Sequence, residues 1–392
     1  MDFYQRALEL NDELIQNRRF FHTNAEVGLR LPKSTEYVIK KLKEYGIEPV
    51  RCGEGVTAVV GCGGKVILLR ADMDALPIKE NSRLPFACPS GEASHGCGHD
   101  LHAAMLLIAA RMLKEQESSL KGTVKLMFQP GEETLEGCRN MIDSGILDAP
   151  SPNAALALHV GAGRLPVGTY LYNDGSTAMM YSSDVFCLTI HGKGAHSAYP
   201  HLSVDPINIG VHIHLALQSL VARESAPSSA CTLIVGEFTG GTAANSIPET
   251  ATLNGTLRTD NPELREKLLH RIAEVSTQTA AAFGGTASTE LSQSVPPLFC
   301  NSDLTKAFTK YIGELPVPGL QGHSGITSGA SEDFAQIAEM IPASLIYLSA
   351  GFSDERGDAP AHSPNVIFNE DVLPFGAAVF AHCAMRWLEN NL

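Results

Sequence analysis

Apolar and polar positions in the first 180 residues form two kinds of segment. Stretches of helical periodicity, such as the one with apolar residues at Val38 and Leu42, are separated by short runs that are continuously apolar. Three such runs begin at Val66, Val124 and Ala154, and the second contains one charged residue, Lys125. A strand covered on both faces has this continuous pattern. Strands that alternate with helices predict an α/β domain with a mostly parallel sheet.

The pattern changes near Ser183, where apolar and polar residues begin to alternate. Residues 184–191 have the pattern of a half-exposed strand, and residues 231–238 and 250–258 follow as further strands. Asn261-Pro262 then opens a helix. This order predicts a small α+β unit of the βαββαβ, or ferredoxin-like, type with one open sheet face.

The first helix of that unit is ambiguous. Residues 207–215 alternate strictly, and this periodicity alone favours a strand. However, Asp205-Pro206 is a typical helix start, and residues 217–223 continue a helical pattern. We therefore expect a helix.

Length and pattern together predict two domains. The chain has 392 residues, which is longer than most single domains. After the βαββαβ unit the α/β pattern returns, and a helix near 377–388 closes the chain. We expect residues 1–182 and 296–392 to form the α/β domain, with residues 183–295 inserted into it as the α+β domain.

Composition and charge exclude some classes of partner. The formal net charge is −14 and the sequence pI is about 5.4, so the chain lacks the basic surface that nucleic acid requires. The nine cysteines are an odd number at scattered positions, unlike a secreted disulfide framework. The most apolar helix, AAMLLIAARML, is interrupted by Arg111, and the charged N-terminal segment resembles no export signal. We expect a cytoplasmic protein with no nucleic-acid or membrane partner.

Ionisable side chains follow all three buried runs. The first run ends in Arg70-Ala-Asp-Met-Asp74, the second leads into Gln129-Pro-Gly-Glu-Glu133, and the third leads into His159. Open α/β sheets bind their ligands at the carboxyl ends of the strands. The functional site is therefore expected along that edge.

The stretch HGCGHDLH, residues 95–102, holds three histidines and a cysteine among glycines. Cys97 and His99 are expected in a loop that leads into a helix over 101–113, and glycines let both side chains point the same way. Taken singly, each histidine is more simply explained as a core residue, and Asp100 as a helix cap. A structural zinc site commonly uses Cys-x-x-Cys units, and a redox pair also needs one; this chain has none.

Further metal donors occur at the predicted edge of the sheet. An adjacent pair such as Glu132 and Glu133 is commonly an exposed helix start. At a ligand edge, however, one carboxylate could bind metal while its neighbour serves as a base. Five donors exceed the four positions of one tetrahedral ion and suit two ions that share a ligand. These donors are Cys97, His99, Glu133, His159 and His362.

The chain resembles the aminoacylase and carboxypeptidase family of dinuclear metal amidohydrolases. Within it, the similarity is to the branch of hippurate hydrolase, N-acetyl-diaminopimelate deacetylase and indole-acetyl-amino-acid hydrolase. The motifs that carry the resemblance are RRFFHTNAEVG (18–28), RADMDALPI (70–78), HGCGHDLHAAM (95–105), FQPGEE (128–133), ALHV (157–160), GKGAHSAYPHLSVDPI (192–207), GGTAANSIP (240–248), SEDFA (331–335) and HSP (362–364). They span nearly the whole chain in the family's order.

The resemblance implies a zinc-peptidase-like catalytic domain with an inserted lid and dimerisation domain. It implies that the five donors hold two divalent ions per chain, with the Cys97 thiolate as a bridge. Such donors suit Zn or Mn, and also Co or Ni. It further implies that Glu132 is the general base and that Asp74 supports the ligands without binding metal.

The resemblance also assigns roles to residues of the inserted domain. His196 would stabilise the developing oxyanion. Asn245 and Arg258 could hold the carboxylate of an acyl amino acid, although a turn residue and an exposed strand cation are plainer explanations. An exposed edge strand would be covered in a homodimer. In relatives that dimerise this way, the histidine matching His196 reaches the partner's site.

The expected function is metal-dependent hydrolysis of the amide bond of small N-acyl amino acids, such as acetyl, benzoyl or aryl-acyl conjugates. A dipeptidase or carboxypeptidase of the same family is the nearest alternative. Two others remain open: a hydrolase with Cys97 or Ser324 as nucleophile, although Ile326 breaks the nucleophile-elbow pattern, and a binding protein without turnover. The presence of Glu132 argues against a pure binder.

Overall fold

The computed structural model describes residues 1–391, which form two compact units. The first unit comprises Met1–Met179, Phe299–Thr327 and the described residues from Asp333 onward. The second comprises Met180–Leu298 and Ser328–Glu332. None of the helices in the described residues has the length and apolar character needed to span a membrane.

An eight-stranded sheet forms the centre of the first unit, in the order β1-β2-β4-β3-β5-β14-β6-β13. The neighbours β4, β3, β5 and β14 are parallel, whereas β1 and β2 on one side, and the β14–β6 pair on the other, are antiparallel. The mostly parallel sheet predicted from the sequence is confirmed. The strands are β1 (Pro49–Cys52), β2 (Gly55–Gly61), β3 (Val66–Asp72), β4 (Thr123–Gln129), β5 (Ala154–Gly161), β6 (Thr169–Tyr172), β13 (Gln321–Ser324) and β14 (Ala343–Ser349).

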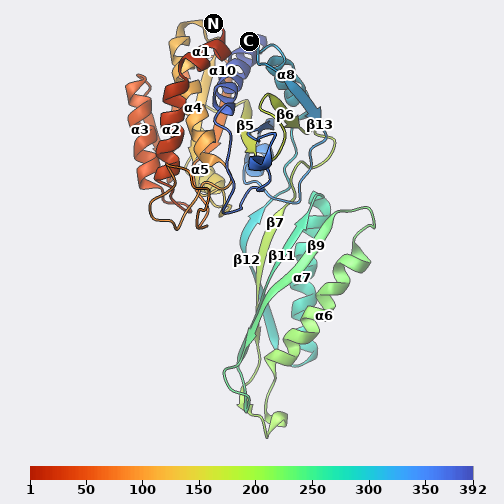
Figure 1. The fold of residues 1–392 in the computed structure, drawn as a ribbon. Helices are drawn as coiled ribbons and strands as arrows, with labels where there is room; N and C mark the ends of the chain where they lie inside the picture. The colour runs from red at the N-terminus through yellow and green to blue at the C-terminus, as the bar shows by residue number, and fades with distance from the viewer. Residues whose placement is uncertain (392) are drawn as a thin grey trace. The chain divides into compact units, whose positions relative to one another are not determined.

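Helices cover both faces of this sheet. On β3, Ile67 and Leu69 face the core shared with α4 and α10, so the alternate residue Arg70 faces the other side. There Arg70 contacts Asp333, which also accepts the N–H of Cys138 in α5. The first and last helices, α1 and α10, pack together (Figure 1). The helices are α1 (Phe3–Glu9), α2 (Asn11–Thr23), α3 (Pro32–Glu44), α4 (His99–Glu115), η1 (Glu117–Ser119), α5 (Gly137–Asp143), α8 (Ser302–Ile312), α9 (Ala335–Ala338), η3 (Glu355–Gly357) and α10 (Val372–Asn390).

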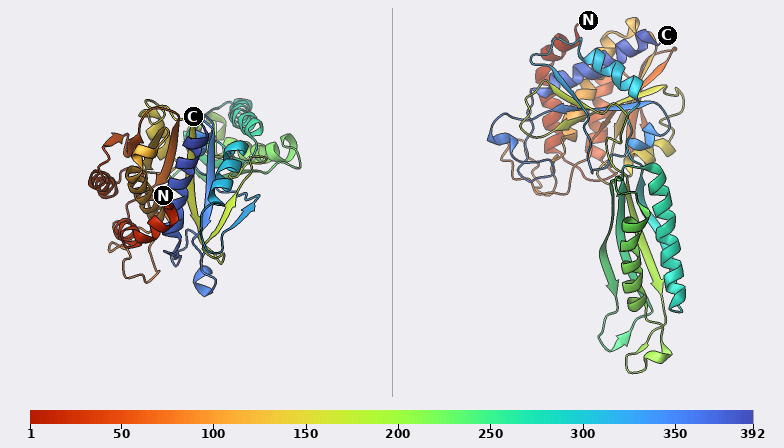
Figure 2. Two further views of the ribbon diagram at one scale, coloured as in Figure 1. Left: turned by 90° about the horizontal axis from the view of Figure 1, so that it is seen from above. Right: turned by 90° about the vertical axis from the view of Figure 1, so that its right-hand side faces the viewer.

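The second unit is a four-stranded antiparallel sheet in the order β12-β7-β11-β9, with α6 and α7 packed on one face (Figures 1 and 2). This is the βαββαβ arrangement expected from the sequence. A two-stranded ribbon of β8 and β10 extends it. The elements are β7 (Ser183–His191), β8 (Ala195–His196), η2 (Pro200–Leu202), α6 (Pro206–Glu224), β9 (Cys231–Gly240), β10 (Ser246–Ile247), β11 (Thr250–Thr259), α7 (Pro262–Ala282) and β12 (Thr286–Val295).

The ambiguous segment 207–215 is helical, as predicted. The Asp205 side chain caps the helix by accepting the N–H groups of Ile207 and Asn208. Within α6 the buried apolar positions recur at helical spacing, at Ile209, Ile213, Leu217 and Leu220. The cap and this buried stripe outweigh the local alternation.

Candidate metal centre

Three neighbouring parallel strands bring the predicted site residues to one edge of the sheet. β3 ends at Asp72, two residues before Asp74. β4 ends shortly before Glu132 and Glu133, and His159 lies near the end of β5. Because the three strands are parallel neighbours, their carboxyl ends coincide. The predicted site residues that follow these strands therefore lie at the edge where the sequence pattern placed them.

The start of α4 depends on one glycine. The helix begins at His99, two residues earlier than the sequence indicates, and Gly98 before it has a φ of +88°. Glycine adopts this left-handed conformation without strain. A Cβ at this position would lie 2.3 Å from Cγ2 of Val160 on β5. Gly98 therefore lies close to β5, and the Sγ atom of the preceding Cys97 lies 3.5 Å from Nε2 of His159 on this strand.

The five predicted donors form two groups that share Cys97. The first group is Cys97, His99 and His159, and the second is Cys97, Glu133 and His362. Within each group the potential ligand atoms lie within 4.8 Å of one another. In the second, Nε2 of His362 is 3.5 Å from Oε1 of Glu133. The thiol is thus placed where a ligand shared by two ions would be.

Hydrogen bonds fix which nitrogen each buried histidine presents. His99 Nδ1 donates to the backbone carbonyl of Asp74 at 2.9 Å, and His159 Nδ1 donates to the carbonyl of Val160 at 2.8 Å. When each ring is neutral, Nε2 is therefore its unprotonated nitrogen. Metal-ligating histidines commonly donate their other N–H in this way.

Two potential ligand atoms test whether the site fits a metal. Nε2 of His99 and Oε1 of Glu133 are buried and have no hydrogen-bond partner among the residues that the structure describes. Buried polar atoms normally have partners because leaving them unpaired is costly. One divalent cation in each donor group would satisfy these two atoms, and the sulfur, nitrogen and carboxylate donors suit zinc and related metals. The residues present therefore fit a metal centre.

Asp74 organises the two adjacent glutamates. Its carboxylate accepts the backbone N–H of Glu132 and that of Glu133, each at 3.0 Å. Its carbonyl also holds His99, as described above. Asp74 thus joins the turn after β4 to the start of α4, which is the geometry of a supporting residue.

Asp72 supports the site as well, but we did not identify it from the sequence. His102 Nδ1 donates to Asp72 at 2.5 Å, and Nε2 of the same ring accepts the N–H of Val160, so His102 has no free nitrogen for a metal. Although burial raises the pKa of Asp72, the guanidinium of Arg70 helps to hold it well below its usual range. Its spacing from Asp74 is the signal that could have identified it, because residues two apart in an extended segment face the same way.

The environment of Cys97 disfavours a thiol nucleophile. Burial raises the pKa of this thiol to about 12. Such a thiol is protonated at neutral pH and reacts slowly unless a metal or a cation stabilises the thiolate. The other nucleophile considered, Ser324, lies on the edge strand β13, four strands away from β3.

Two of the predicted substrate-contacting residues lie together in the second unit. His196 on β8 pairs with Ser246 on β10, next to Asn245. The N–H of Ala198 donates to His196 Nδ1 at 3.1 Å. In the neutral ring the proton is therefore on Nε2, and the side chain is exposed. This imidazole can donate a hydrogen bond from Nε2.

Arg258 lies elsewhere in the second unit. β11 starts with Thr250 opposite His191, the residue that ends β7 shortly before His196. Arg258 is eight residues further along β11, roughly 26 Å at the usual rise per residue. There its guanidinium donates to Ser331 at 2.8 Å. The structure thus does not bring Arg258 together with His196 and Asn245 in one chain.

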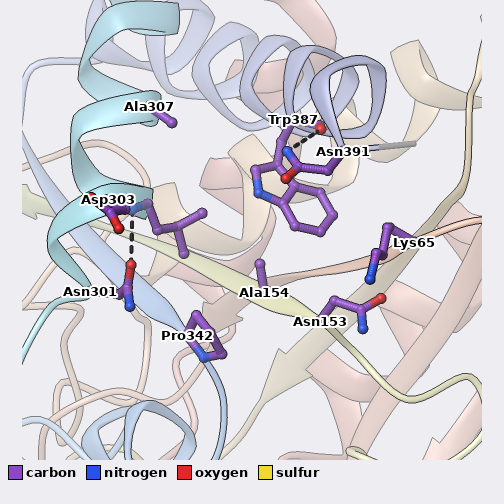
Figure 3. A pocket seen from close by; sticks show the side chains of 10 residues that line it. Lys65, Asn153, Ala154, Asn301, Asp303, Ala307, Pro342, Trp387 and Asn391 are labelled. Carbon is purple, nitrogen blue, oxygen red and sulfur yellow. Dashed lines mark hydrogen bonds between the residues drawn. The ribbon is translucent and has the colours of Figure 1, made fainter.

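A hollow of about 390 Å³ lies at the opposite end of the parallel strands (Figure 3). It is lined by Lys65 before β3, by Asn153 before β5, by Pro342 before β14 and by Trp387 of α10. These positions are the amino ends of the strands. None of the predicted site residues lines this hollow.

The fold is an α/β domain with a mostly parallel sheet, and two donor groups that share one cysteine lie at its carboxyl edge with a glutamate beside them. These features define a metal-dependent hydrolase. Comparison with known proteins gives the family: residues 68–386 match the model of peptidase family M20/M25/M40, and the chain belongs to this family. The resemblance inferred from the motifs is confirmed, and the chain is an amidohydrolase of the M20 family.

Several relatives are similar over almost their full length. The chain is 36% identical to the IAA-amino acid hydrolase ILR1-like 2 of Arabidopsis thaliana, covering 99% of this chain and 88% of the relative. It is also 36% identical to the N-acetyl-L-cysteine deacetylase of Bacillus subtilis, covering 97% and 90%. Among solved structures, the YXEP protein of Bacillus subtilis, described as a dinuclear metal binding peptidase of the M20 family, matches with a TM-score of 0.80 and 29% identity, covering 98% of this chain and 100% of that one.

Proposed function

We propose that this protein hydrolyses the amide bond of N-acyl amino acids and releases the acid and the amino acid. The observation that carries the proposal is the pair of donor groups that share Cys97, with Glu132 directly beside the donor Glu133. The names of the two relatives, a hydrolase of indole-acetyl amino acids and a deacetylase of N-acetylcysteine, support this substrate class.

Cys97, His99, Glu133, His159 and His362 would hold two divalent ions per chain, Zn or Mn, with Co or Ni also suited to these donors. When bound, the ions would polarise the amide carbonyl and make a water molecule acidic enough to lose a proton near neutral pH.

Glu132 would accept and return that proton. Its carboxylate lies 4.0 Å from His99 Nε2, and Asp74 fixes its backbone. From this position Glu132 would take the proton of the attacking water and later deliver it to the departing amine nitrogen. Asp74 would keep Glu132 and Glu133 in these different roles by holding both backbone amides.

The second unit would complete the site in a homodimer. The exposed Nε2–H of His196 suits stabilisation of the oxyanion. Asn245 beside it and Arg258 would both contact the substrate carboxylate. Because His196 and Arg258 lie far apart on one chain, a single substrate would meet the two residues only if they come from different chains.

An apolar surface of the second unit supports this dimer. β9 is an edge strand on which the side chains of Ile234 and Phe238 are exposed, Ile234 by 56%. On the neighbouring α6, Val211 and Leu215 are exposed as well, Leu215 by 59%. Pairing two copies across a two-fold axis would cover this edge and these side chains.

We also propose that the protein works in the cytoplasm. All nine cysteines are free thiols in the structure, as expected in a reducing compartment.

The test is a substrate screen with defined metals. The protein is stripped with a chelator and reloaded with Zn, Mn, Co or Ni, and release of the amino acid is measured from acetyl, benzoyl and indole-acetyl amino acids and from dipeptides. We expect activity only after reloading and faster release from acyl amino acids. Full activity in the stripped protein would contradict the metal mechanism, and faster cleavage of dipeptides would favour a peptidase.

A further inference from the structure

Helix α2 carries two buried basic residues that none of the roles above explains. The side chain of Arg18 is 1% exposed, and its Nε donates to Oδ2 of Asp100 at 3.0 Å. His22 Nδ1 lies 2.8 Å from the same oxygen, and its Nε2 lies 3.0 Å from Oε1 of Glu80. Asp100 directly follows the donor His99. The two basic residues therefore contact both the start of α4 and a second segment that contains Glu80.

His22 is charged in this setting. Burial lowers its pKa, but the hydrogen bonds that the ring donates to the carboxylates of Asp100 and Glu80 raise it to about 9, against a smaller opposing effect of Arg18. Both ring nitrogens then donate at neutral pH. Because the side chains of His22 and Glu80 are each only 5% exposed, their ion pair is shielded from water and salt.

Glu80 belongs to a loop, residues 77–93, whose base is closed by two backbone hydrogen bonds between Leu76 and Ser94. Within the loop the Glu80 carboxylate also accepts the Ser82 hydroxyl and, at 3.4 Å, the N–H of Cys88. Glu80 therefore joins its loop to α2 and also joins parts of the loop to each other.

The same loop contacts the segment of His362. The N–H of Asn81 donates to the carbonyl of Pro364 at 2.7 Å, and the N–H of His362 donates to the carbonyl of Gly96 at 2.9 Å. His362 has a φ of +64°, a left-handed conformation that is unfavourable for a residue with a Cβ. Such a conformation persists only where its surroundings hold it. These two hydrogen bonds tie the segment to its surroundings, and a turn bond from the N–H of Ser363 to the carbonyl of Pro360 at 3.2 Å closes it locally.

We propose that His22 and Glu80 are positioning residues for His362: their ion pair fixes the loop 77–93, and the loop, through Asn81, holds His362 in its left-handed conformation. The inference rests on the proposed function, in which His362 is a metal donor. It adds that the second donor group is kept in place by α2, a helix that contributes no ligand.

The first test uses metal-free protein, so that it does not depend on catalysis. Glu80→Gln and His22→Gln each remove the ion pair, and in each variant the new side chain is similar in size to the one it replaces. Hydrogen–deuterium exchange is measured for peptides containing Asn81 and His362, whose amides are hydrogen-bonded. We expect exchange at both to be faster by about tenfold or more, the equivalent of one charge-assisted hydrogen bond. Glu314→Gln is the matched control, because Glu314 contacts His382 at 3.1 Å and none of the donors.

The second test is titration of the same variants with Zn, next to His362→Ala. We expect each ion-pair variant to bind one ion as the wild type does and the other about tenfold more weakly. His362→Ala is expected to weaken binding of the same ion. Unchanged exchange in both folded variants would overturn the inference, as would faster exchange with unchanged affinity for both ions. If His362→Ala itself binds both ions normally, the proposed donor role of His362 is what fails.

Discussion

Glu132 and Glu133 are neighbours that share one support and yet have different surroundings. Asp74 holds both backbone amides, but only Glu133 belongs to the donor group with Cys97 and His362. Residue type and order in the chain could predict that one of the pair binds metal. They could not show how the pair is separated, because that depends on contacts with Asp74.

Replacing the two glutamates separately should give different defects. Glu132→Ala is expected to keep a metal content near that of the wild type and to lose turnover by about 100-fold or more, because it removes only the proton acceptor. Glu133→Ala should lose both metal and turnover. Metal analysis after dialysis, together with rate measurements, checks this division. Equal loss of metal in both variants would contradict it.

Cys97→Ser should weaken binding of both ions, because Cys97 belongs to both donor groups. The hydroxyl that replaces the thiol is a much poorer ligand for zinc. Cys138→Ser is the control, since Cys138 is a buried free cysteine that lies in α5 outside both groups. Metal titration of the two variants is the measurement. Loss of only one ion in Cys97→Ser would rule out a shared thiolate.

At the scale of elements, α4 shows what the sequence could and could not predict. The apolar stripe of residues 101–113 predicts the helix, but the helix begins at His99 and so includes a donor. The early start follows from the left-handed Gly98 and its contact with Val160, a residue from another strand. Periodicity contains no information about such a contact between distant segments.

Gly98→Ala should therefore damage both stability and metal binding. A left-handed alanine costs about 1–2 kcal/mol, and here its Cβ would also lie 2.3 Å from Val160, so β5 or the donor loop must move. Gly63→Ala is the matched control, because Gly63 has a φ of +67° with open space around it. We expect a larger fall in melting temperature, and a loss of metal, only for Gly98→Ala. Equal effects would show that the contact with Val160 is unimportant.

At the scale of the molecule, the order of strands and helices could be predicted well for both units, because each has a distinct periodicity. The apolar runs predicted β3, β4 and β5 of the first sheet, and the alternating runs predicted β7, β9 and β11 of the second. The strands β1, β2, β6 and β13, and the ribbon of β8 and β10, were not predicted. Residues 328–332 belong to the second unit through backbone contacts such as Tyr181 N–H to the carbonyl of Ala330 at 2.9 Å. Their sequence has no pattern that indicates this.

The proposed dimer predicts complementation between two inactive variants. Glu132→Ala and His196→Ala proteins should each be inactive or slow, but mixed dimers should regain up to half of the wild-type rate, because one of the two sites then receives both intact residues. Subunit exchange is followed by mass and the rate is measured on the mixture. Confirmed exchange without recovered activity would show that His196 does not act on the partner's site.

The position of β14 has a consequence for synthesis of the protein. This strand lies between β5 and β6 in the sheet, although it follows them by more than a hundred residues in the chain. All strands and helices of the second unit are present once β12 has left the ribosome, while the first unit still lacks an inner strand and the donor His362. We therefore expect nascent chains to combine a folded insertion with an open sheet, and loading of the second donor group to begin only after synthesis has passed His362.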